Sequence, residues 1–451
     1  MADLTTLRRD AREIFRRTLE GVDAGGAMRR AVSLTNSTLR ILDDEFNLRA
    51  HPLKIYSVAM GKAAAAMASV LDETLGERLS GGVVSATTTP AKLSSRWRVF
   101  NGGHPLPDDE SIHAARAAFE LLRDADSSSA LIIFLVSGGG SAMLELPRDA
   151  RVTLADLREA NRTLVTCGAS IEEINAVRRM LSSVKGGGLS ARVPRAAQIS
   201  LIVSDTERGR EFDVASGPTF ETDADPATAL DVLAKYDLAR ALPATILRAL
   251  DEARARQSVA ATQGALRGHH VLLDNERAVE CAAAEARARG YEVECARDIV
   301  SQHVAGGASG MISRLVNLYR RKGTRESGVC VVSGGEFSCP VRGLGVGGRN
   351  AETALRCAIE FGALAMSETG DTLPDHLVAL CAGTDGIDGN SPAAGALADE
   401  TTTRRAFEKN VDAARHLEES DAYTFFDSLN DAVVTGPTGT NVRDLRIMLA
   451  S

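Results

Sequence analysis

Residues 131–141 read LIIFLVSGGGS, an apolar run followed at once by three glycines between two serines. A short continuous apolar run with a turn signal behind it is typical of a strand buried on both faces of a parallel sheet. Open parallel sheets bind their ligands at the carboxyl ends of the strands. The stretch therefore predicts an α/β fold, with a first candidate site at the glycine turn.

Further short apolar runs alternate with alanine-rich helical stretches along the chain, which predicts parallel α/β layers. They cover residues 53–59, 199–203, 271–273, 329–332 and 377–381. Apolar periodicity is lost within residues 243–268, so we expect a domain boundary there. The predicted domains are residues 1–262 and residues 263–451, the second starting with a strand over residues 269–273.

Composition narrows the class of function. The chain has 52 Lys and Arg against 60 Asp and Glu, a net charge of −8, and only 4% aromatic residues, which disfavours a nucleic-acid partner. No apolar run approaches the roughly 18 residues of a membrane span, so no membrane partner is expected. Seven cysteines without a CxxC spacing and an N-terminus that lacks an export signal predict a cytoplasmic protein. Small-molecule chemistry is favoured.

Two loops combine a cation with glycine at the expected start of a helix. Lys62 follows Gly61 and leads into a run of alanines, and a cation beside oriented N–H groups can hold a phosphate or a carboxylate. Arg349 and Asn350 follow a glycine-rich loop in the same way, and the guanidinium fork suits either anion. A solvated loop is the alternative for both.

The glycine turn after residues 131–136 is the third candidate. It contains Ser137, Gly138, Gly139, Gly140 and Ser141. Its glycines let successive backbone N–H groups close on an anion, and both hydroxyl groups can add donors. The turn fits neither a Walker A loop nor a dinucleotide fingerprint. Lys185, followed by three glycines, repeats the pattern. A tight strand-to-helix turn is the alternative.

Acidic residues follow two of the predicted strands. Asp385 and Asp388 lie three residues apart on a glycine-broken loop and can hold Mg²⁺ together with water and phosphate oxygens. Asp205 could join them as a ligand or act as a general base. For each carboxylate an Asx turn is the alternative. His104 lies in a proline-bracketed loop that either touches a substrate or only turns the chain.

Nine stretches, taken in chain order, cover nearly the whole sequence. They are Met60–Ala63, Gly102–Asp108, Ser137–Ala142, Leu181–Gly187, Ala215–Thr219, Ser333–Glu336, Gly347–Asn350, Gly383–Gly389 and Gly436–Asn441. Together they resemble the class II glycerate kinase family, the glycerate 2-kinases (DUF4147/MOFRL family), whose C-terminal part is called the MOFRL domain.

The resemblance implies a Rossmann-like parallel-sheet N-terminal domain and a second α/β domain, with the active site in the interdomain cleft. It implies phosphorylation of D-glycerate at the 2-hydroxyl by ATP with Mg²⁺, giving 2-phospho-D-glycerate, and catalytic roles for Lys62 and Arg349. To these we add Asp205 as the base for the 2-hydroxyl. The remaining contacts predicted are Ser137 to Ser141, Lys185, His104 and Asn350 for substrate or phosphate, and Asp385, Asp388 and Glu336 for metal or nucleotide.

Three other functions stay open. A kinase for another small hydroxy acid is suggested by residues 206–211, TERGRE, which lack the acid usual in the family and carry two arginines. A reductase of hydroxypyruvate or tartronate semialdehyde is disfavoured because no dinucleotide fingerprint precedes a ribose-binding acid. A catalytically silent nucleotide-binding paralogue is disfavoured by the retained charged residues. A homodimer is an open alternative for the assembly.

Overall fold

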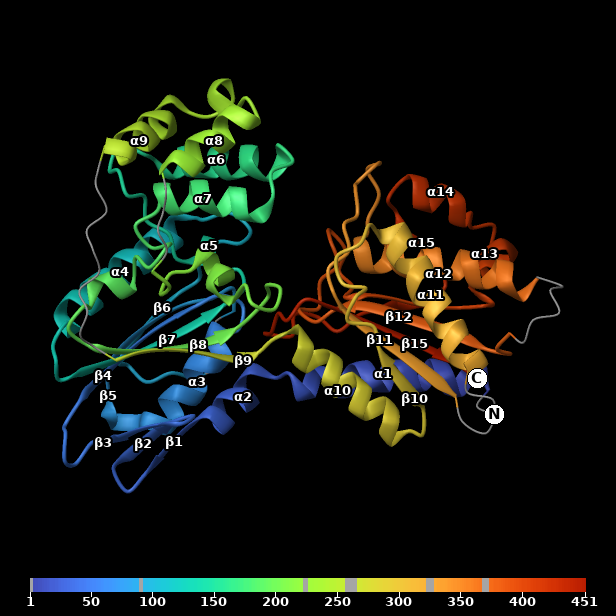
Figure 1. Cartoon of the computed structure of the whole chain (residues 1–451), viewed down its shortest axis with the longest axis horizontal. Helices are drawn as coiled ribbons and strands as arrows, with labels where there is room; N and C mark the ends of the chain where they lie inside the picture. Colours follow the sequence, from blue (N-terminus) through green and yellow to red (C-terminus); the bar gives the residue numbers. More distant parts are fainter. Residues whose placement is uncertain (1–2, 89–91, 222–225, 256–265, 322–327, 367–372) are drawn as a thin grey trace. The chain divides into compact units, whose positions relative to one another are not determined.

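The computed structural model describes residues 3–88, 92–221, 226–255, 266–321, 328–366 and 373–451 (Figure 1). The chain forms two compact units. Residues 24–273 make up one, here called the parallel-sheet unit, and residues 1–23 join residues 274–451 in the other, the mixed-sheet unit. The chain thus begins in the mixed-sheet unit, passes through the whole parallel-sheet unit and returns.

Six strands form the central sheet of the parallel-sheet unit, in the order β6-β5-β4-β7-β8-β9. They are β4 (Lys54–Met60), β5 (Leu79–Ser85), β6 (Trp97–Phe100), β7 (Ala130–Ser137), β8 (Ala197–Val203) and β9 (Arg267–Leu273). Every pairing in this sheet is parallel. The order reverses between β4 and β7, as in dinucleotide-binding folds. The predicted Rossmann-like sheet is confirmed.

Helices and a small meander complete this unit. The helices are α2 (Ala24–Ala31), α3 (Ala64–Leu75), α4 (Asp109–Ala125), α5 (Gly140–Met143), α6 (Leu154–Thr166), α7 (Ile171–Leu181), α8 (Pro226–Lys235) and α9 (Ala244–Ala255), with short 3₁₀ turns at Gly76–Arg78, Ser190–Arg192, Glu211–Ser216 and Leu238–Arg240. Strands β1 (Val32–Thr35), β2 (Thr38–Ile41) and β3 (Asp44–Asn47) form an antiparallel meander. Helices α6 to α9 pack around a hydrophobic cluster of their own.

The mixed-sheet unit has a second six-stranded sheet, in the order β10-β11-β15-β12-β13-β14. Its strands are β10 (Glu292–Cys295), β11 (Val329–Gly335), β12 (Leu377–Gly383), β13 (Gly395–Asp399), β14 (Ala432–Val433) and β15 (Asp444–Ala450). Only β10 and β11 pair in parallel. The α/β class is confirmed, but the predicted parallel layering is wrong here, because β15 inserts antiparallel between β11 and β12.

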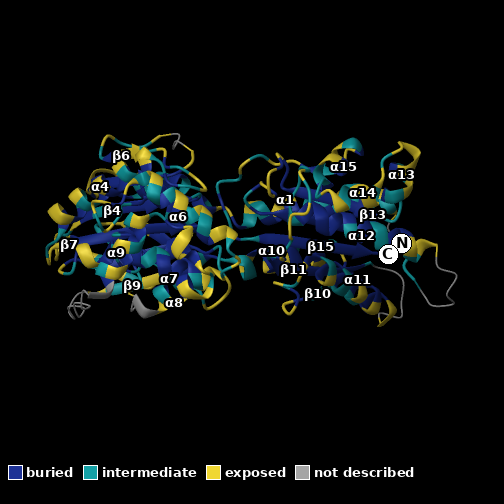
Figure 2. Cartoon of the chain, turned by 90° about the horizontal axis from the view of Figure 1, so that it is seen from above, coloured by how far each residue is buried: buried dark blue, intermediate teal, exposed yellow. Residues whose placement is uncertain are grey.

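Helices of this unit come from both ends of the chain. They are α1 (Leu4–Gly21), α10 (Asn275–Ala288), α11 (Val304–Arg321), α12 (Arg349–Ala365), α13 (Thr402–Glu408), α14 (Ala413–Glu418) and α15 (Ala422–Ser428). In both units the inner strands of the six-stranded sheet are largely buried, while exposed residues lie on outer helix faces, loops and edge strands (Figure 2). Among the described residues, no helix combines the length and the apolar character needed to cross a membrane.

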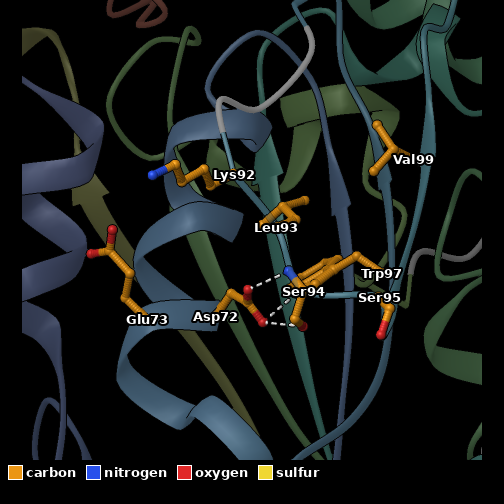
Figure 3. A pocket seen from close by; sticks show the side chains of 8 residues that line it. All are labelled: Asp72, Glu73, Lys92, Leu93, Ser94, Ser95, Trp97 and Val99. Atoms are coloured by element: carbon orange, nitrogen blue, oxygen red, sulfur yellow. Dashed lines mark hydrogen bonds between the residues drawn. The ribbon is translucent and has the colours of Figure 1, made fainter.

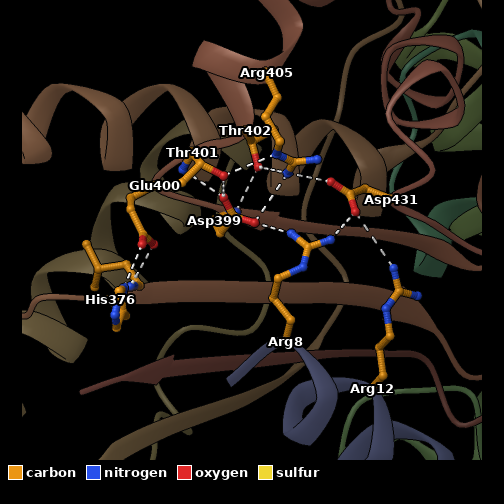
Figure 4. Close-up of polar contacts among 10 residues, drawn as sticks. Arg8, Arg12, His376, Asp399, Glu400, Thr401, Thr402, Arg405 and Asp431 are labelled. Atoms are coloured by element: carbon orange, nitrogen blue, oxygen red, sulfur yellow. Dashed lines mark hydrogen bonds and ion pairs between the residues drawn. The ribbon is translucent and has the colours of Figure 1, made fainter. Parts of the chain in front are cut away.

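Helix α1 corrects the predicted domain division at the N-terminus. Its apolar face is buried, and Arg8 binds the carboxylates of Asp399 and Asp431, whose side chains are each 1% exposed (Figure 4). Tyr291 Oη donates a hydrogen bond of 2.9 Å to Asp10. A buried carboxylate needs a paired cation, so these contacts anchor α1 to the unit that contains residues 274–451.

Strand β9 corrects the division at its other end. We expected residues 269–273 to open the second domain, but β9 pairs in parallel with β8 and closes the first sheet as its edge strand. The chain leaves the parallel-sheet unit after Leu273. The predicted boundary between residues 262 and 263 lies outside the described residues. Alternation of strand and helix cannot reveal which sheet an edge strand joins, because that depends on long-range pairing.

Candidate active site

The loops after β4 and β7 meet where the strand order reverses. The Lys62 amide donates to the carbonyl oxygen of Gly138 over 2.9 Å. Ser137 Oγ donates to the carbonyl of Met60 over 3.2 Å and accepts from the Ala63 amide over 3.1 Å. Two motifs that the sequence separates by more than seventy residues are thus locked together. Helix α3 begins here without a side-chain cap, which leaves its positive end suited to an anion.

Two further predicted residues face the glycine turn. A Cβ atom placed on Gly138 would lie 2.0 Å from Asp205 Oδ2, and one placed on Gly139 would lie 3.1 Å from the His104 ring. Gly139 also has a φ of +82°, which favours glycine. Any side chain at these positions would displace Asp205 or press on His104. The close approach explains the glycines and brings a carboxylate and an imidazole to the same turn.

Lys185 has a different environment from the one predicted. Its side chain is 2% exposed, and its ammonium group is ion-paired with Glu145, which is 4% exposed. Burial is the main influence on the pKa of Lys185 and lowers it. Glu145 also accepts a 2.5 Å hydrogen bond from Ser182 Oγ. These contacts favour a structural role for Lys185, as the cation of a buried ion pair, over contact with a substrate.

A second polar cluster surrounds the first residue of β15. In the sheet, Asp444 is paired with Gly335 at the end of β11 and with Gly383 at the end of β12. Arg349, the first residue of α12, donates from Nε to Asp444 over 2.5 Å and from Nη2 over 3.2 Å. The same Nη2 lies 2.8 Å from Glu336. Burial opposes the charge of Arg349, but the neighbouring carboxylates, Asp444 foremost, together more than compensate, so the pKa of Arg349 is raised.

Asp388 and Asn350 lie at the base of the same helix. Both are buried, and Asp388 accepts from the amides of Asn350 over 3.0 Å and Ala351 over 2.8 Å. Burial raises the pKa of Asp388 to about 7 against these hydrogen bonds. Its oxygens therefore cap α12, which favours the scaffolding alternative for Asp388. Within the described part of the chain, the buried Oδ1 of Asn350 has no hydrogen-bond partner.

Asp385, a predicted acid, and Asp444 together suit a hard cation. A Cβ atom at Gly383 would lie 3.1 Å from Asp385 Oδ1 and 3.6 Å from Asp444 Oδ1, so two carboxylates converge on the end of β12. Mg²⁺ is usually held by one or two carboxylates, with water and phosphate oxygens completing the shell. This donor set fits Mg²⁺, although no group of three or more His, Cys, Asp or Glu within the described ranges has metal-binding geometry.

A pocket of about 830 Å³ lies elsewhere on the parallel-sheet unit (Figure 3). It is lined by Asp72, Glu73, Lys92, Leu93, Ser94, Ser95, Trp97 and Val99. Trp97 begins β6, so the pocket lies at the amino end of the strands, away from the glycine turn. The Asp72 carboxylate accepts from the amide and hydroxyl of Ser94 and from Trp97 Nε1. It is therefore engaged in holding this loop.

Sequence reasoning missed Asp444, which holds Arg349, and also Ser216 and Asn175, which form hydrogen bonds behind Ser141. The short apolar run over residues 447–450 could have indicated β15, although Arg446 interrupts the apolar pattern after Asp444. Ser216 lies in the Ala215–Thr219 motif, to which we assigned no role. Asn175 carries no local signal, since a single polar residue on an amphipathic helix is usually exposed.

The fold and these loops define an α/β protein with glycine-rich turns and charged side chains at the carboxyl ends of its strands. Residues 10–251 match the model of a domain of unknown function, DUF4147, and residues 329–444 match the MOFRL family. Over its full length and that of the relative, the chain is 29% identical to "D-glycerate 2-kinase" of Thermotoga maritima.

It is also 35% identical to "Putative hydroxypyruvate reductase" of Agrobacterium vitis, over 87% of this chain and 98% of the relative. The crystal structure of glycerate kinase from Thermotoga maritima superposes with a TM-score of 0.80 at 29% identity, covering 99% of this chain and all of that one. The chain belongs to the glycerate 2-kinase family.

Proposed function

We propose that this protein transfers the γ-phosphoryl group of ATP to the 2-hydroxyl of D-glycerate, giving 2-phospho-D-glycerate. The observation that carries the proposal is the full-length similarity to a D-glycerate 2-kinase, together with the glycine turn and Lys62 at the strand-order reversal. Phosphoryl transfer needs positioned cations and hydrogen-bond donors more than covalent catalysis. Lys62 and Arg349 supply such cations.

The residues divide into three tasks. Lys62 and Arg349 bind and neutralise the transferred phosphoryl group or the glycerate carboxylate. Asp205, held over the glycine turn, takes the proton from the 2-hydroxyl as it attacks. Asp385 and Asp444 are the residues that would hold Mg²⁺, which with ATP supplies a neutralised phosphoryl donor. His104 contacts the substrate beside Gly139, and Glu336 and Asn350 support the helix that carries Arg349.

A coupled assay for ADP release with Mg-ATP and D-glycerate tests the proposal. L-glycerate, tartronate and hydroxypyruvate run alongside, and phosphorus NMR reads the position of the new phosphate. Turnover to 2-phosphoglycerate is expected. A faster reaction with another acid would replace the substrate and keep the chemistry, whereas nucleotide binding without turnover would leave only the silent paralogue.

Asp205→Asn tests the base. We expect kcat to fall by about 10²–10⁴-fold, the usual contribution of a positioned general base, with little change in the KM for ATP. Asp231→Asn, a change of the same kind on α8, is the control and should leave kcat unchanged. Near-full activity of Asp205→Asn would remove Asp205 from this role.

A reductase is the second candidate, favoured by the name of the Agrobacterium relative. The turn after β4, the first strand of the parallel sheet, reads MGKAAAA and lacks the G-x-G-x-x-G that lets a dinucleotide pyrophosphate approach the backbone. We therefore expect no oxidation of NADH or NADPH in the presence of hydroxypyruvate. Absorbance of the reduced cofactor distinguishes the two functions. Cytoplasmic location and a homodimer remain predictions.

A further inference from the structure

A chain of hydroxyl groups leads away from the glycine turn into the parallel-sheet unit. Ser141 Oγ lies 3.1 Å from Ser216 Oγ, and Ser216 Oγ donates over 3.0 Å to the amide oxygen of Asn175. Ser216 and Asn175 are each 3% exposed, whereas Ser141 is half-buried at the turn. Ser141 is thus the outer end of a polar chain with a buried inner end.

The hydroxyl hydrogen atoms in this series of hydrogen bonds can be assigned one by one. A serine hydroxyl has one hydrogen to donate and two lone pairs with which to accept. Because Ser216 gives its hydrogen to Asn175, it can only accept from Ser141. Ser141 must therefore donate to Ser216, and only its lone pairs remain for a ligand. Ser137 likewise gives its hydrogen to the carbonyl oxygen of Met60. These partners argue against our expectation that both hydroxyl groups add donors for a bound anion.

The inner end of the chain is held in an unusual backbone conformation. Ala215 and Ser216 have φ values of +51° and +61°, in the left-handed region that non-glycine residues seldom adopt. The Gly186 amide and Arg179 Nε both donate to the carbonyl oxygen of Ser216, over 3.1 Å and 3.4 Å. Strained backbone that is held by several contacts is characteristic of functional sites. Here it places the Ser216 hydroxyl between Ser141 and Asn175.

We propose that Ser141 accepts a hydrogen bond from a hydroxyl group of the substrate, and that Ser216 and Asn175 are positioning residues that fix this direction. The glycine turn would then recognise a hydroxyl-bearing acid through Ser141, while anions are bound by Lys62 and backbone amides. The inference rests on the proposed function in taking a hydroxy acid such as D-glycerate as the ligand.

Two probes separate an acceptor from a donor. D-glycerate has hydroxyl hydrogens to give, whereas sulfate has only acceptors at neutral pH. Binding of D-glycerate is measured by titration calorimetry on the full chain, and sulfate by its competition with D-glycerate. We expect Ser141→Ala to weaken D-glycerate by about 2–10-fold, the loss of one hydrogen bond, and to leave the sulfate constant unchanged. Equal weakening of both ligands would overturn the proposal.

Ser216→Ala should change the affinities for D-glycerate and for sulfate in opposite directions. It weakens D-glycerate by a similar factor, and it tightens sulfate because the hydrogen of Ser141 is released to turn toward an anion. A merely structural role for Ser216 would weaken both. Asn175→Asp keeps an acceptor at the inner end and should preserve the wild-type order, whereas Asn175→Ala should behave like Ser216→Ala. Ser129→Ala, next to the amino end of β7, is the matched control.

The outcome is separable from that of the proposed function. If the wild type binds D-glycerate with these variant effects but releases no ADP, the kinase proposal fails and the role of Ser141 stands. If the wild type makes 2-phosphoglycerate and Ser141→Ala retains D-glycerate affinity, the role of Ser141 fails and the kinase proposal stands. Absence of D-glycerate binding to the wild type would overturn both.

Discussion

The two units gather polar groups at the same kind of place by different means. In the parallel-sheet unit, β4 and β7 run side by side, and glycines let backbone and side chains approach closely. In the mixed-sheet unit, β11 and β12 are separated by the antiparallel β15, so its first residue, Asp444, lies between their ends and holds Arg349. The first arrangement exposes backbone amides at a glycine turn. The second presents the guanidinium group of Arg349, which is held by carboxylates.

A cation next to glycine in the sequence can therefore have different roles in the structure. Lys62, Lys185 and Arg349 all follow or precede glycine in the sequence. Lys185 is nevertheless buried on Glu145, and the fork of Arg349 is divided between Asp444 and Glu336. The role of each cation therefore depends on which carboxylates surround it and how deeply they are buried, and the sequence around the cation shows neither.

The largest expected effect concerns the buried pair of the parallel-sheet unit. Glu145→Gln should lower the free energy of unfolding by about 3–5 kcal/mol, because the ammonium group of Lys185 stays buried without its counter-charge. Urea unfolding followed by the fluorescence of Trp97, the single tryptophan, reports on this unit. Glu120→Gln, which breaks the exposed pair with Arg98, should cost about 0–1 kcal/mol. Equal losses would contradict the structural role of Lys185.

Asp388 predicts a pH effect confined to the mixed-sheet unit. Its folded pKa of about 7 lies above the usual 3.8, so between these values the folded state binds more protons than the unfolded state. Unfolding free energy then falls as pH rises, by up to about 4 kcal/mol for a shift of about three pKa units. Asp388→Asn removes this dependence.

Calorimetric Tm values should therefore shift in favour of the Asp388→Asn variant from about pH 5 to about pH 8. Trp97 fluorescence, which reports on the other unit, should show no such difference between variant and wild type. Parallel Tm profiles of the two proteins would contradict a raised pKa for Asp388.

Catalysis is expected to need both Lys62 and Arg349. Lys62→Ala and Arg349→Lys should each lower kcat for D-glycerate by about 10²–10³-fold, the cost of losing one group that stabilises transition-state charge. Arg349→Lys keeps a positive charge for Asp444 but loses the planar fork. Arg277→Ala, which removes an exposed cation of α10, is the control. Full activity of either site variant would assign catalysis to the other unit alone.

The smallest expected effect tests the placement of α1. Arg8→Ala should destabilise the mixed-sheet unit by about 1–3 kcal/mol, because Asp399 and Asp431 lose one donor but keep Arg405. Arg16→Ala, on the exposed face of the same helix, should leave the Tm nearly unchanged, because solvent screens its ion pairs. Calorimetry of the two variants makes the comparison. Identical Tm values would argue against anchoring of α1 by Arg8.

Local sequence was sufficient for the strands that carry the site in the parallel-sheet unit, and for β11 and β12 in the mixed-sheet unit. The apolar run 131–136 and its glycines predict β7 and its turn, because burial on both faces leaves a continuous apolar pattern and close approach leaves glycine. The other predicted runs also lie within observed strands or overlap them; they cover residues 53–59, 199–203, 271–273, 329–332 and 377–381. Lys62, Asp205 and His104 were chosen for the same reason, since each lies near a strand end or in a rigid loop.

The remaining features of the fold depend on contacts between segments that are far apart in the sequence. The antiparallel β15, the return of α1 to the mixed-sheet unit and the place of β9 depend on contacts between residues that lie far apart in the sequence. The same holds for the carboxylates that bind Lys185 and Arg349, and for the order of donors from Ser141 to Asn175. A sequence pattern records which side chains are buried, but the partner that satisfies a buried charge or hydroxyl is chosen only when the chain folds.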